Sequence, residues 1–289
     1  MDLVRYILSI SVVIAHCNII LGTSIYWPVS SGIAVEGFFA LSGYLMYGSY
    51  MKRNNWFSFV RSRARRIVPP YIKIVVAAAL GFSLVSTLTV AEYFSPPGFW
   101  KYLGANLLFL NFLHPTLPGC FEGNNVTAVN GSLWTIKVEW ALYLTIPLFF
   151  FLLRKAKGKS ASIACIFTAI GLFSLVYKEL MEYLYMTTGK ELFHILARQF
   201  VAQLYVFYAG VGFAHYADFV SKHKGKLFIL CLITFVTLSS LMAGYDSPVI
   251  ELCYDFLSPP CLAALVIIPS IYYQIKPLAN RLGNYSYEI

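Results

Sequence analysis

Two residues in the first hydrophobic stretch, 3–22, could do chemistry within a membrane: Arg5 and His16. They are eleven positions apart, so on a helix they come within about 20° of one face and about 16 Å of each other along the axis. An ionisable side chain deep in such a stretch costs roughly 2.5 kcal/mol or more, which favours a functional role. The structural alternative is a histidine bonded to a neighbouring backbone, with Arg5 reaching the inner headgroups.

Two carboxylates are expected at the depth of His16 on other helices. Glu36 lies roughly 8 Å below the outer end of the second apolar stretch, and Glu139 roughly 10 Å into the fourth. Charges at such depths usually face a cavity and pair with one another. A carboxylate beside a histidine holds one tautomer and makes the ring a better base, as general-base catalysis requires. A structural His–Glu or Lys–Glu pair is the alternative, because Lys137 is close in the sequence.

Four arginines form a cluster on the opposite, inner side: Arg61, Arg63, Arg65 and Arg66. A guanidinium binds phosphate in a bidentate manner, so the cluster suits a phosphorylated donor that arrives from the cytoplasm. The alternative is an anchor that touches anionic lipid headgroups. Acid–base groups towards the outer side and phosphate binders on the inner side together suggest transfer of a group across the membrane.

The composition indicates an all-α polytopic membrane protein. Of 289 residues, 58% are hydrophobic and 12% charged, against about 25% charged residues in soluble domains. The net charge of +9 does not indicate nucleic acid, because the basic residues lie in short loops between apolar stretches. The six cysteines show no metal-ligand spacing, so neither a metal site nor a disulfide framework is predicted.

About eight transmembrane helices and an incomplete ninth are predicted from the length that a bilayer requires. Lys and Arg concentrate in alternate loops, which places the N-terminus in the cytoplasm. The predicted inner loops are 51–66, 154–159, 222–226 and 276–281, and the predicted outer loops are 22–32, 89–131, 178–198 and 244–250. The apolar segment 99–115 would break this alternation if it crossed, so it is predicted to be an interfacial or re-entrant helix of an outer loop. The predicted spans are 3–22, 31–50, 68–88, 132–153, 161–177, 198–217, 227–243 and 251–273.

Four segments resemble the membrane acyltransferase-3 family, the polysaccharide O-acyltransferases. They occur in the family's order and at matching topological positions. They are RYILSISVVIAH (5–16), EGFFALSGY (36–44), RARRIVPPY (63–71) and SLWTIKVEWALYLTIP (132–147). The last residues, LGNYSYEI (282–289), resemble the opening of a late family helix and stop before its histidine. The chain is therefore expected to be one acyltransferase-like domain, 1–289, truncated at its C-terminus.

The resemblance implies transfer of an acetyl or other short acyl group from acyl-CoA to a hydroxyl of a cell-surface polysaccharide or glycolipid. His16 would be the general base or a transient acyl carrier, and Glu36 or Glu139 would orient it or stabilise its charge. Arg5 would lie between His16 and the donor. No permanently bound cofactor, metal or nucleic-acid partner is implied, and no oligomeric state is predicted.

The same resemblance assigns the CoA phosphates to Arg63 and Arg66, with Arg61 and Arg65 beside them. The expected location is the lipid bilayer, as a multi-pass protein of the inner membrane if the source is bacterial. Two other classes stay open: a transporter or flippase of acyl or glycan-lipid groups, and a non-catalytic membrane subunit. Transporters often carry paired broken spans in two repeated halves, whereas the Pro259-Pro260 break of the eighth span has no counterpart in a repeated half.

Overall fold

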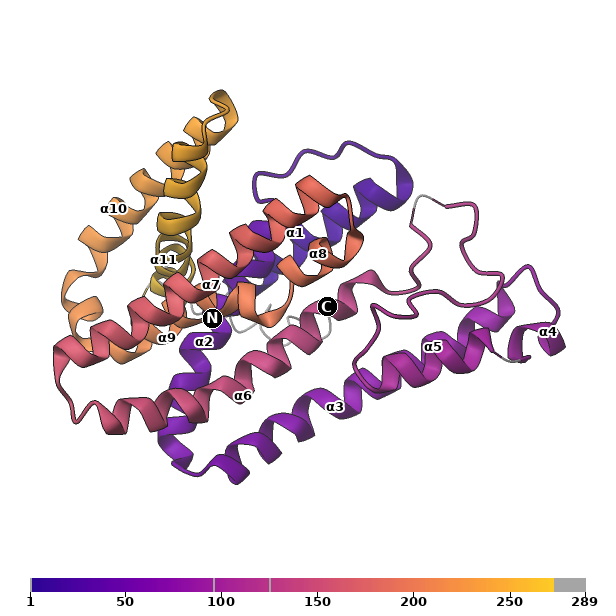
Figure 1. Cartoon of the computed structure of the whole chain (residues 1–289), viewed down its shortest axis with the longest axis horizontal. Coiled ribbons are helices and arrows are strands. Elements are labelled where there is room, and N and C mark those ends of the chain that lie inside the picture. The colour runs from indigo at the N-terminus through magenta and orange to yellow at the C-terminus, as the bar shows by residue number, and fades with distance from the viewer. Residues whose placement is uncertain (1, 96, 125, 273–289) are drawn as a thin grey trace.

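The computed structural model describes residues 2–95, 97–124 and 126–272, and every regular element in these ranges is a helix (Figure 1). The long helices are α1 Asp2–Leu21, α2 Ser31–Arg53, α3 Trp56–Gly81, α6 Trp134–Lys155, α7 Ser160–Thr188, α9 Phe200–His215, α10 Ala217–Gly244 and α11 Pro248–Tyr272. The short ones are η1 Phe82–Leu84, α4 Val90–Phe94, α5 Gly98–Leu107, η2 Gly131–Leu133 and α8 Glu191–Ala197. The all-helical fold is thus confirmed for the described residues, while 282–289 and the incomplete ninth span lie outside them.

Each of the eight predicted spans contains a helix, but only six described helices are long and apolar enough to cross a membrane. The other two are α2 and α9. The 16 residues of α9 reach about 24 Å, less than the roughly 30 Å hydrocarbon core. Helix α2 carries Glu36 and several glycines and serines, which lower its hydropathy. The structure therefore supports a multi-pass membrane protein, whereas the count of eight spans and the cytoplasmic N-terminus stay predictions.

Two predicted loops are helical instead. Helix α3 begins at Trp56, where the Asn55 side chain accepts a hydrogen bond from the Ser58 backbone N–H at 2.9 Å. The arginine cluster 61–66 therefore lies on a helix and not in a loop 51–66. Helix α7 continues to Thr188, where Gly189 ends it in the left-handed conformation, and α8 covers Glu191–Ala197, so most of the predicted outer loop 178–198 is also helix. Charged residues had been assigned to loops, although a helix can continue through them when neighbouring helices partner the charges.

Helix α2 is the centre of the bundle and packs against α1, α6, α9 and α11 (Figure 1). Its crossing with α9 is very close. A Cβ atom on Gly43 would lie 2.0 Å from the Phe207 carbonyl oxygen, and one on Gly210 would lie 1.9 Å from the Ala40 carbonyl oxygen. Small residues let helix backbones approach where lipid gives no hydrophobic drive for association. The SGY segment of α2 thus has a packing role at Gly43.

Replacing Gly43 or Gly210 with alanine is expected to lower the melting temperature of the purified protein in detergent. The added methyl group meets backbone atoms that cannot rotate away, and overpacking of this kind costs about 1–3 kcal/mol. Gly48→Ala on the same helix is the matched control, because nothing lies within 4 Å of its built Cβ atom. An alanine there should be neutral or stabilising. Equal melting temperatures for Gly43→Ala and Gly48→Ala would contradict the close crossing.

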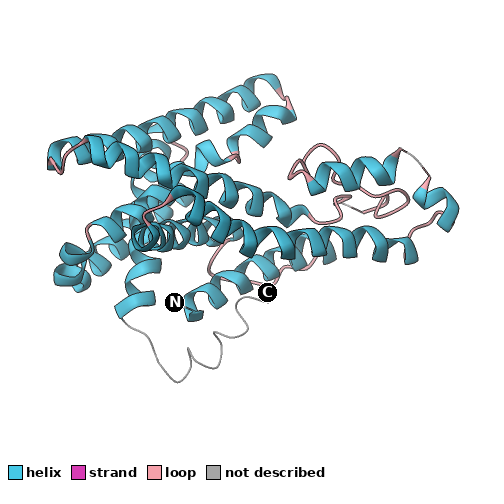
Figure 2. Ribbon diagram, turned by 90° about the horizontal axis from the view of Figure 1, so that it is seen from below, coloured by secondary structure: helices cyan, strands magenta, loops and turns pink. Residues whose placement is uncertain are grey.

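The outer segment 99–115 forms α5 and the turns after it. Helix α5 lies alongside the second half of α3 (Figure 2). The Tyr71 hydroxyl donates to the Asn106 carbonyl at 2.7 Å, and the Tyr71 ring stacks on Phe109 at 4.2 Å between centroids. The predicted helix is present and is held against the protein, which fixes the loop that follows it.

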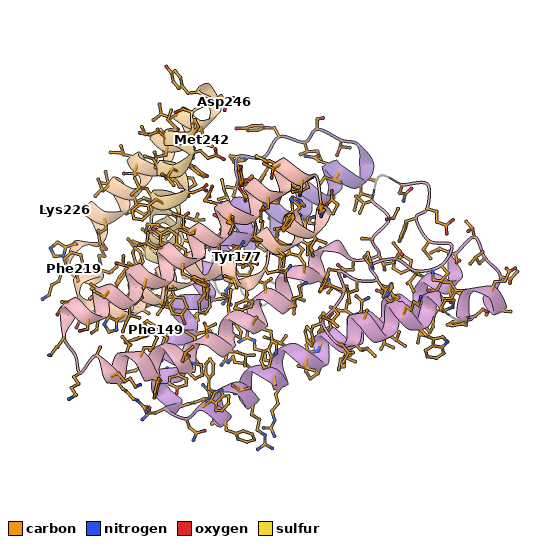
Figure 3. All side chains as sticks on the ribbon, viewed as in Figure 1. Phe149, Tyr177, Phe219, Lys226, Met242 and Asp246 are labelled. Carbon is orange, nitrogen blue, oxygen red and sulfur yellow. The ribbon has the colours of Figure 1, made fainter. Side chains whose placement is uncertain are left out.

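Helices α10 and α11 pack against each other at the edge of the bundle. Figure 3 labels Phe219, Lys226 and Met242 along α10. Apolar side chains such as Leu230 and Ile233 are about 60% exposed in the protein alone. A helix with so many exposed apolar side chains is expected to face lipid. The candidate site residues therefore lie on the helices that pack around α2.

Candidate active site

His16 is held in a defined orientation by its own helix. Its Nδ1 lies 2.8 Å from the Val12 carbonyl oxygen, one helical turn earlier. A carbonyl oxygen only accepts, so Nδ1 carries the proton and Nε2 has the free lone pair. This is the tautomer that a general base needs at Nε2. The expected carboxylate partner is thus replaced by a backbone carbonyl, which a helical side chain can reach because it leans towards the N-terminus.

The Nε2 atom of His16 faces Ser132, whose Oγ lies 3.5 Å away. Ser132 is exposed and belongs to the short turn η2 that leads into α6. The pairing brings together two of the sequence segments that resemble the family, 5–16 and 132–147. The Ser132 hydroxyl therefore lies where the hydroxyl of an acceptor would have to approach His16 Nε2.

Glu139 lies one layer deeper, about 10 Å along α6 from Ser132. Its Oε1 accepts a hydrogen bond from the Ser42 hydroxyl at 2.8 Å and a very short one from Tyr143. Within the described residues no hydrogen bond or ion pair joins Glu139 to His16, and Lys137 does not pair with it either. The structure therefore brings Glu139 near the middle of α2 instead of beside the histidine.

Arg63 lies below Glu139 on the same side of α2. It donates to Ser49 Oγ at 3.1 Å and is within electrostatic reach of Glu139 and Tyr143. Seven residues separate Ser42 from Ser49, which puts them on one face of α2, about 10 Å apart. Ser42 thus binds the Glu139 carboxylate, and two turns further along α2 Ser49 binds the Arg63 guanidinium.

The remaining arginines are distributed differently. Arg61, Arg65 and Arg66 are exposed, whereas Arg63 is half-buried. On a helix Arg63 and Arg66 share one side and Arg61 and Arg65 the other. Arg5 is half-buried on α1, near the opposite end of that helix from His16.

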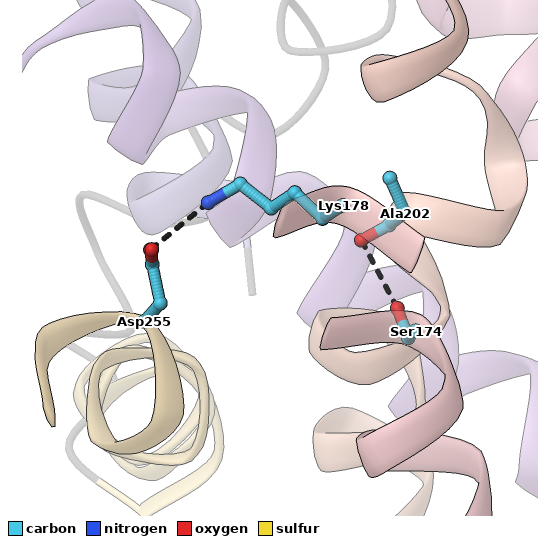
Figure 4. Close-up of polar contacts among 4 residues, drawn as sticks. All are labelled: Ser174, Lys178, Ala202 and Asp255. Atoms are coloured by element: carbon cyan, nitrogen blue, oxygen red, sulfur yellow. Dashed lines mark hydrogen bonds and ion pairs between the residues drawn. The ribbon is translucent and has the colours of Figure 1, made fainter. Parts of the chain in front are cut away.

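Glu36 belongs to a different group of charges. It is within electrostatic reach of Lys178 and Asp255, which form an ion pair of 2.9 Å between α7 and α11 (Figure 4). Glu36 and Gly43 are seven residues apart and so share the face of α2 that meets α9, away from Ser42. The expected pairing of Glu36 with His16 is absent from the hydrogen bonds and ion pairs of the described residues. Glu36 projects from a face of α2 that is directed at Lys178 and Asp255. Two residues at the same depth in the membrane meet only if their helices turn those faces towards each other.

The Lys178–Asp255 pair was missed from the sequence. Lys178 had been assigned to an outer loop, although Lys178 and Glu182 are four positions apart on the continuing helix α7. Glu179 and Glu182 are also within electrostatic reach of Lys178. Beside them, Ser174 donates to the Ala202 carbonyl at 3.1 Å and ties α7 to α9 (Figure 4). Asp255 within the eighth apolar stretch was the available signal, since a charge there predicts a partner.

A cavity of about 160 Å³ is lined by Gly131, the residue before Ser132, at the end of α6 that is predicted to face outward, and we call it the outer cavity. Its walls come from the outer segment, from the turn that includes Gly131, and from the junction of α8 and α9. Side chains that line it include Trp134, Lys137 and Arg198. A concave, mainly apolar site with a few convergent polar groups, close in sequence to the partner of His16, is where a substrate would bind.

A second cavity, of about 360 Å³, lies between α2, α3 and α6 at the end of the bundle that is predicted to face the cytoplasm, and we call it the inner cavity. Tyr50, Trp56 and Arg154 line it, and Arg154 Nη2 lies 2.5 Å from Asn54 Oδ1. None of the four clustered arginines is among its described lining residues. Arg154 is therefore an additional guanidinium at this end of the bundle, and it is not among the donor-binding residues predicted from the sequence.

These features define a helical, multi-pass membrane protein with an oriented histidine, whose partner Ser132 adjoins a cavity residue in sequence, and with hydrogen-bonded polar groups further along α2 and α6. The chain belongs to the acyltransferase-3 family: the family's domain, described as an acyltransferase domain, matches residues 1–289. The family resemblance and the assignment as an acyltransferase enzyme are thus confirmed. No solved structure shows a significant match to the chain.

Three named proteins are similar in sequence to the chain. An O-acetyl transferase of Shigella phage Sf6 is 23% identical over the whole chain and 81% of its own length. Acyltransferase MdmB of Streptomyces mycarofaciens is 30% identical over 50% of the chain and 38% of its own length. Nodulation protein 10 of Rhizobium leguminosarum bv. viciae is 24% identical over 57% of the chain and 47% of its own length. The first two names support acyl transfer, and the first supports transfer to a hydroxyl.

Proposed function

We propose that the chain transfers an acetyl or other short acyl group from acyl-CoA to a hydroxyl of a cell-surface polysaccharide or glycolipid. The observation that carries this proposal is the free Nε2 of His16, directed at Ser132 beside the outer cavity. The O-acetyl transferase similar to this chain supports the acetyl group and the hydroxyl acceptor. The proposed location is the cytoplasmic membrane of a bacterial cell, with the N-terminus inside.

In the proposed reaction His16 Nε2 takes the proton of the acceptor hydroxyl while its oxygen attacks the thioester carbonyl. The new C–O bond forms, the C–S bond breaks, and the departing thiolate of CoA receives the proton from the imidazolium. The alternative route forms an acyl-histidine first and then passes the acyl group to the acceptor. Both routes need Nε2 without a proton, which the Val12 carbonyl favours.

Glu139 would supply a fixed negative charge beneath the histidine. Ser42 and Tyr143 hold its carboxylate, so the charge is oriented without a direct bond to the ring. Such preorganised groups stabilise charge that develops in the transition state. Glu36 would act through packing, by engaging the Lys178–Asp255 pair and so positioning α7 and α11 around α2.

On the predicted inner side, the exposed Arg61, Arg65 and Arg66 would contact the phosphates of acyl-CoA, and Arg154 would add a guanidinium at the inner cavity. Arg63 would link this region to Glu139. Arg5, on α1, would lie on the route of the acyl group between the donor and His16.

The Arg66→Gln variant is expected to raise the KM for acyl-CoA about tenfold or more with little change in kcat. Hydrogen bonds to charged groups are worth about 1.5–3 kcal/mol, and 1.4 kcal/mol is a factor of ten in affinity. Steady-state kinetics in membranes measure both constants. Lys222→Gln is the matched control, because Lys222 is an exposed cation of α10 away from the cluster. Equal KM values for both variants would contradict a role of Arg66 in donor binding.

Release of free CoA tests the function itself. Membranes that contain the chain are incubated with acetyl-CoA, with and without an acceptor glycan. An acyltransferase releases CoA in a glycan-dependent manner, whereas a transporter moves the acyl group without cleaving the thioester. Glycan uptake or flipping without CoA release would overturn the proposal.

A further inference from the structure

The described lining of the outer cavity is positively charged. Two cations line it: Lys137 from α6 and Arg198 from the junction between α8 and α9. None of the eleven described residues that line the cavity is acidic. Its volume of about 160 Å³ is far above the 10–15 Å³ that one water needs. The two cations come from segments about sixty residues apart, so the fold brings like charges to one cavity.

No carboxylate among the described residues forms an ion pair with the Lys137 ammonium. Its Nζ is buried and has no hydrogen-bond partner, and it lies 4.1 Å from the centroid of the Phe112 ring, another residue of the cavity. A cation over an aromatic ring gains some electrostatic stabilisation. That contact leaves the donors of the ammonium unsatisfied, and a buried charge is costly unless it is paired. An anion in the cavity would supply the missing acceptor.

The other groups of the cavity suit a sugar ring. Trp134 and Phe112 offer aromatic faces, and Asn111 has a buried amide oxygen without a hydrogen-bond partner. Asn106 is already occupied, since its amide donates to the Tyr102 and His114 carbonyls at 2.8 and 3.0 Å and so holds the loop in place. The cavity therefore combines a fixed wall, aromatic surface, one amide acceptor and two cations.

The geometry points to an acidic acceptor: the outer cavity binds a saccharide through an anionic substituent, a carboxylate or a phosphate, held by Lys137 and Arg198. This inference rests on the proposed function, since Gly131 of the cavity directly precedes Ser132, the partner of His16 Nε2. The anionic group would fix the ring against Trp134. A hydroxyl of the same or the adjacent sugar would then face the base.

Binding in the absence of donor tests the anion site directly. Purified full-length chain in detergent is titrated with a uronic-acid oligosaccharide, with its carboxyl-reduced neutral counterpart, and with a phosphate-bearing oligosaccharide of the same backbone. Binding is followed by tryptophan fluorescence and by calorimetry. We expect at least one acidic form to bind ten times or more tightly than the neutral form, with weaker binding at higher salt. The two acidic forms show whether a carboxylate or a phosphate is preferred.

Variants separate the two cations from general folding. Lys137→Met and Arg198→Gln should remove the preference for the acidic form while binding of the neutral form is unchanged. Lys101→Met, at an exposed lysine of α5 in the same outer region, should keep the preference. Equal binding of acidic and neutral forms by the unaltered chain, or a preference that survives both cavity variants, would overturn the inference.

The same experiment distinguishes this inference from the proposed function. Acidic glycan binding that depends on Lys137 and Arg198, without CoA release from acetyl-CoA, would support the anion site and reject the transferase chemistry. CoA release that is stimulated equally by the neutral and acidic glycans would support the transferase and reject the anion site.

Discussion

Replacement of His16 with alanine is expected to abolish glycan-dependent acyl transfer, with kcat/KM lower by at least 10²–10⁴-fold, the usual contribution of a general base. The variant removes the ring nitrogen that lies 3.5 Å from Ser132 Oγ, and Ser132 directly follows Gly131, which lines the outer cavity. Protein abundance should be unchanged, because the ring's other hydrogen bond is to its own helix, at Val12. The measurement is CoA release together with the amount of folded protein in the same membranes.

Ser132→Ala is the informative companion to His16→Ala. If an acceptor sugar provides the reacting hydroxyl, the serine variant keeps most of the activity, since Ser132 only lines the approach. If Ser132 were itself acylated, both variants would be equally inactive. Full activity of His16→Ala in well-folded protein would reject the assignment of the base altogether.

The two routes through His16 differ in one observable. In a single turnover without acceptor, an acyl-histidine route leaves the acyl group on the protein, and mass spectrometry of the peptide that contains His16 detects the added mass. A general-base route leaves the peptide unmodified. Both results keep His16 at the centre of the chemistry, and each selects one mechanism.

Much of the fold was predictable because apolar length is a strong signal in membranes. All eight apolar stretches are helices, and the helix in 99–115 was also expected. The ends of α3 and α7 were not predictable in the same way. Charged residues such as Arg61 and Lys178 were assigned to loops on hydropathy alone, whereas neighbouring polar groups allow the helix to continue through them.

The membrane depth of the candidate site residues could be predicted from the sequence, but the direction in which each side chain projects could not. His16, Glu36 and Glu139 were expected to meet because they lie at similar distances from the outer surface. The structure directs Glu36 to the Lys178–Asp255 pair and Glu139 to Ser42. Direction depends on which helices pack against each face of α2, and the close crossing at Gly43 decides that. Such long-range packing is not encoded in the spacing of a single segment.

The Glu139→Gln variant is expected to lower kcat by about 10²-fold or more while the melting temperature stays close to that of the unaltered chain. Glutamine keeps the size of the side chain and an oxygen that can accept from Ser42 and Tyr143. It removes the negative charge, and loss of one preorganised electrostatic group typically costs 10²–10³ in kcat. Kinetics and thermal unfolding of the same preparation separate the two effects, and Glu191→Gln at an exposed outer position is the matched control.

A purely structural role for Glu139 would give the opposite pattern: Glu139→Gln would keep full kcat, and only Glu139→Ala would lose stability. Arg63 provides a further test, because its guanidinium is within electrostatic reach of Glu139. If the two charges act together, Arg63→Gln and Glu139→Gln are non-additive, and the double variant is no worse in kcat than the poorer single variant. Additive losses would instead mean that Arg63 serves the donor side and Glu139 serves His16 independently.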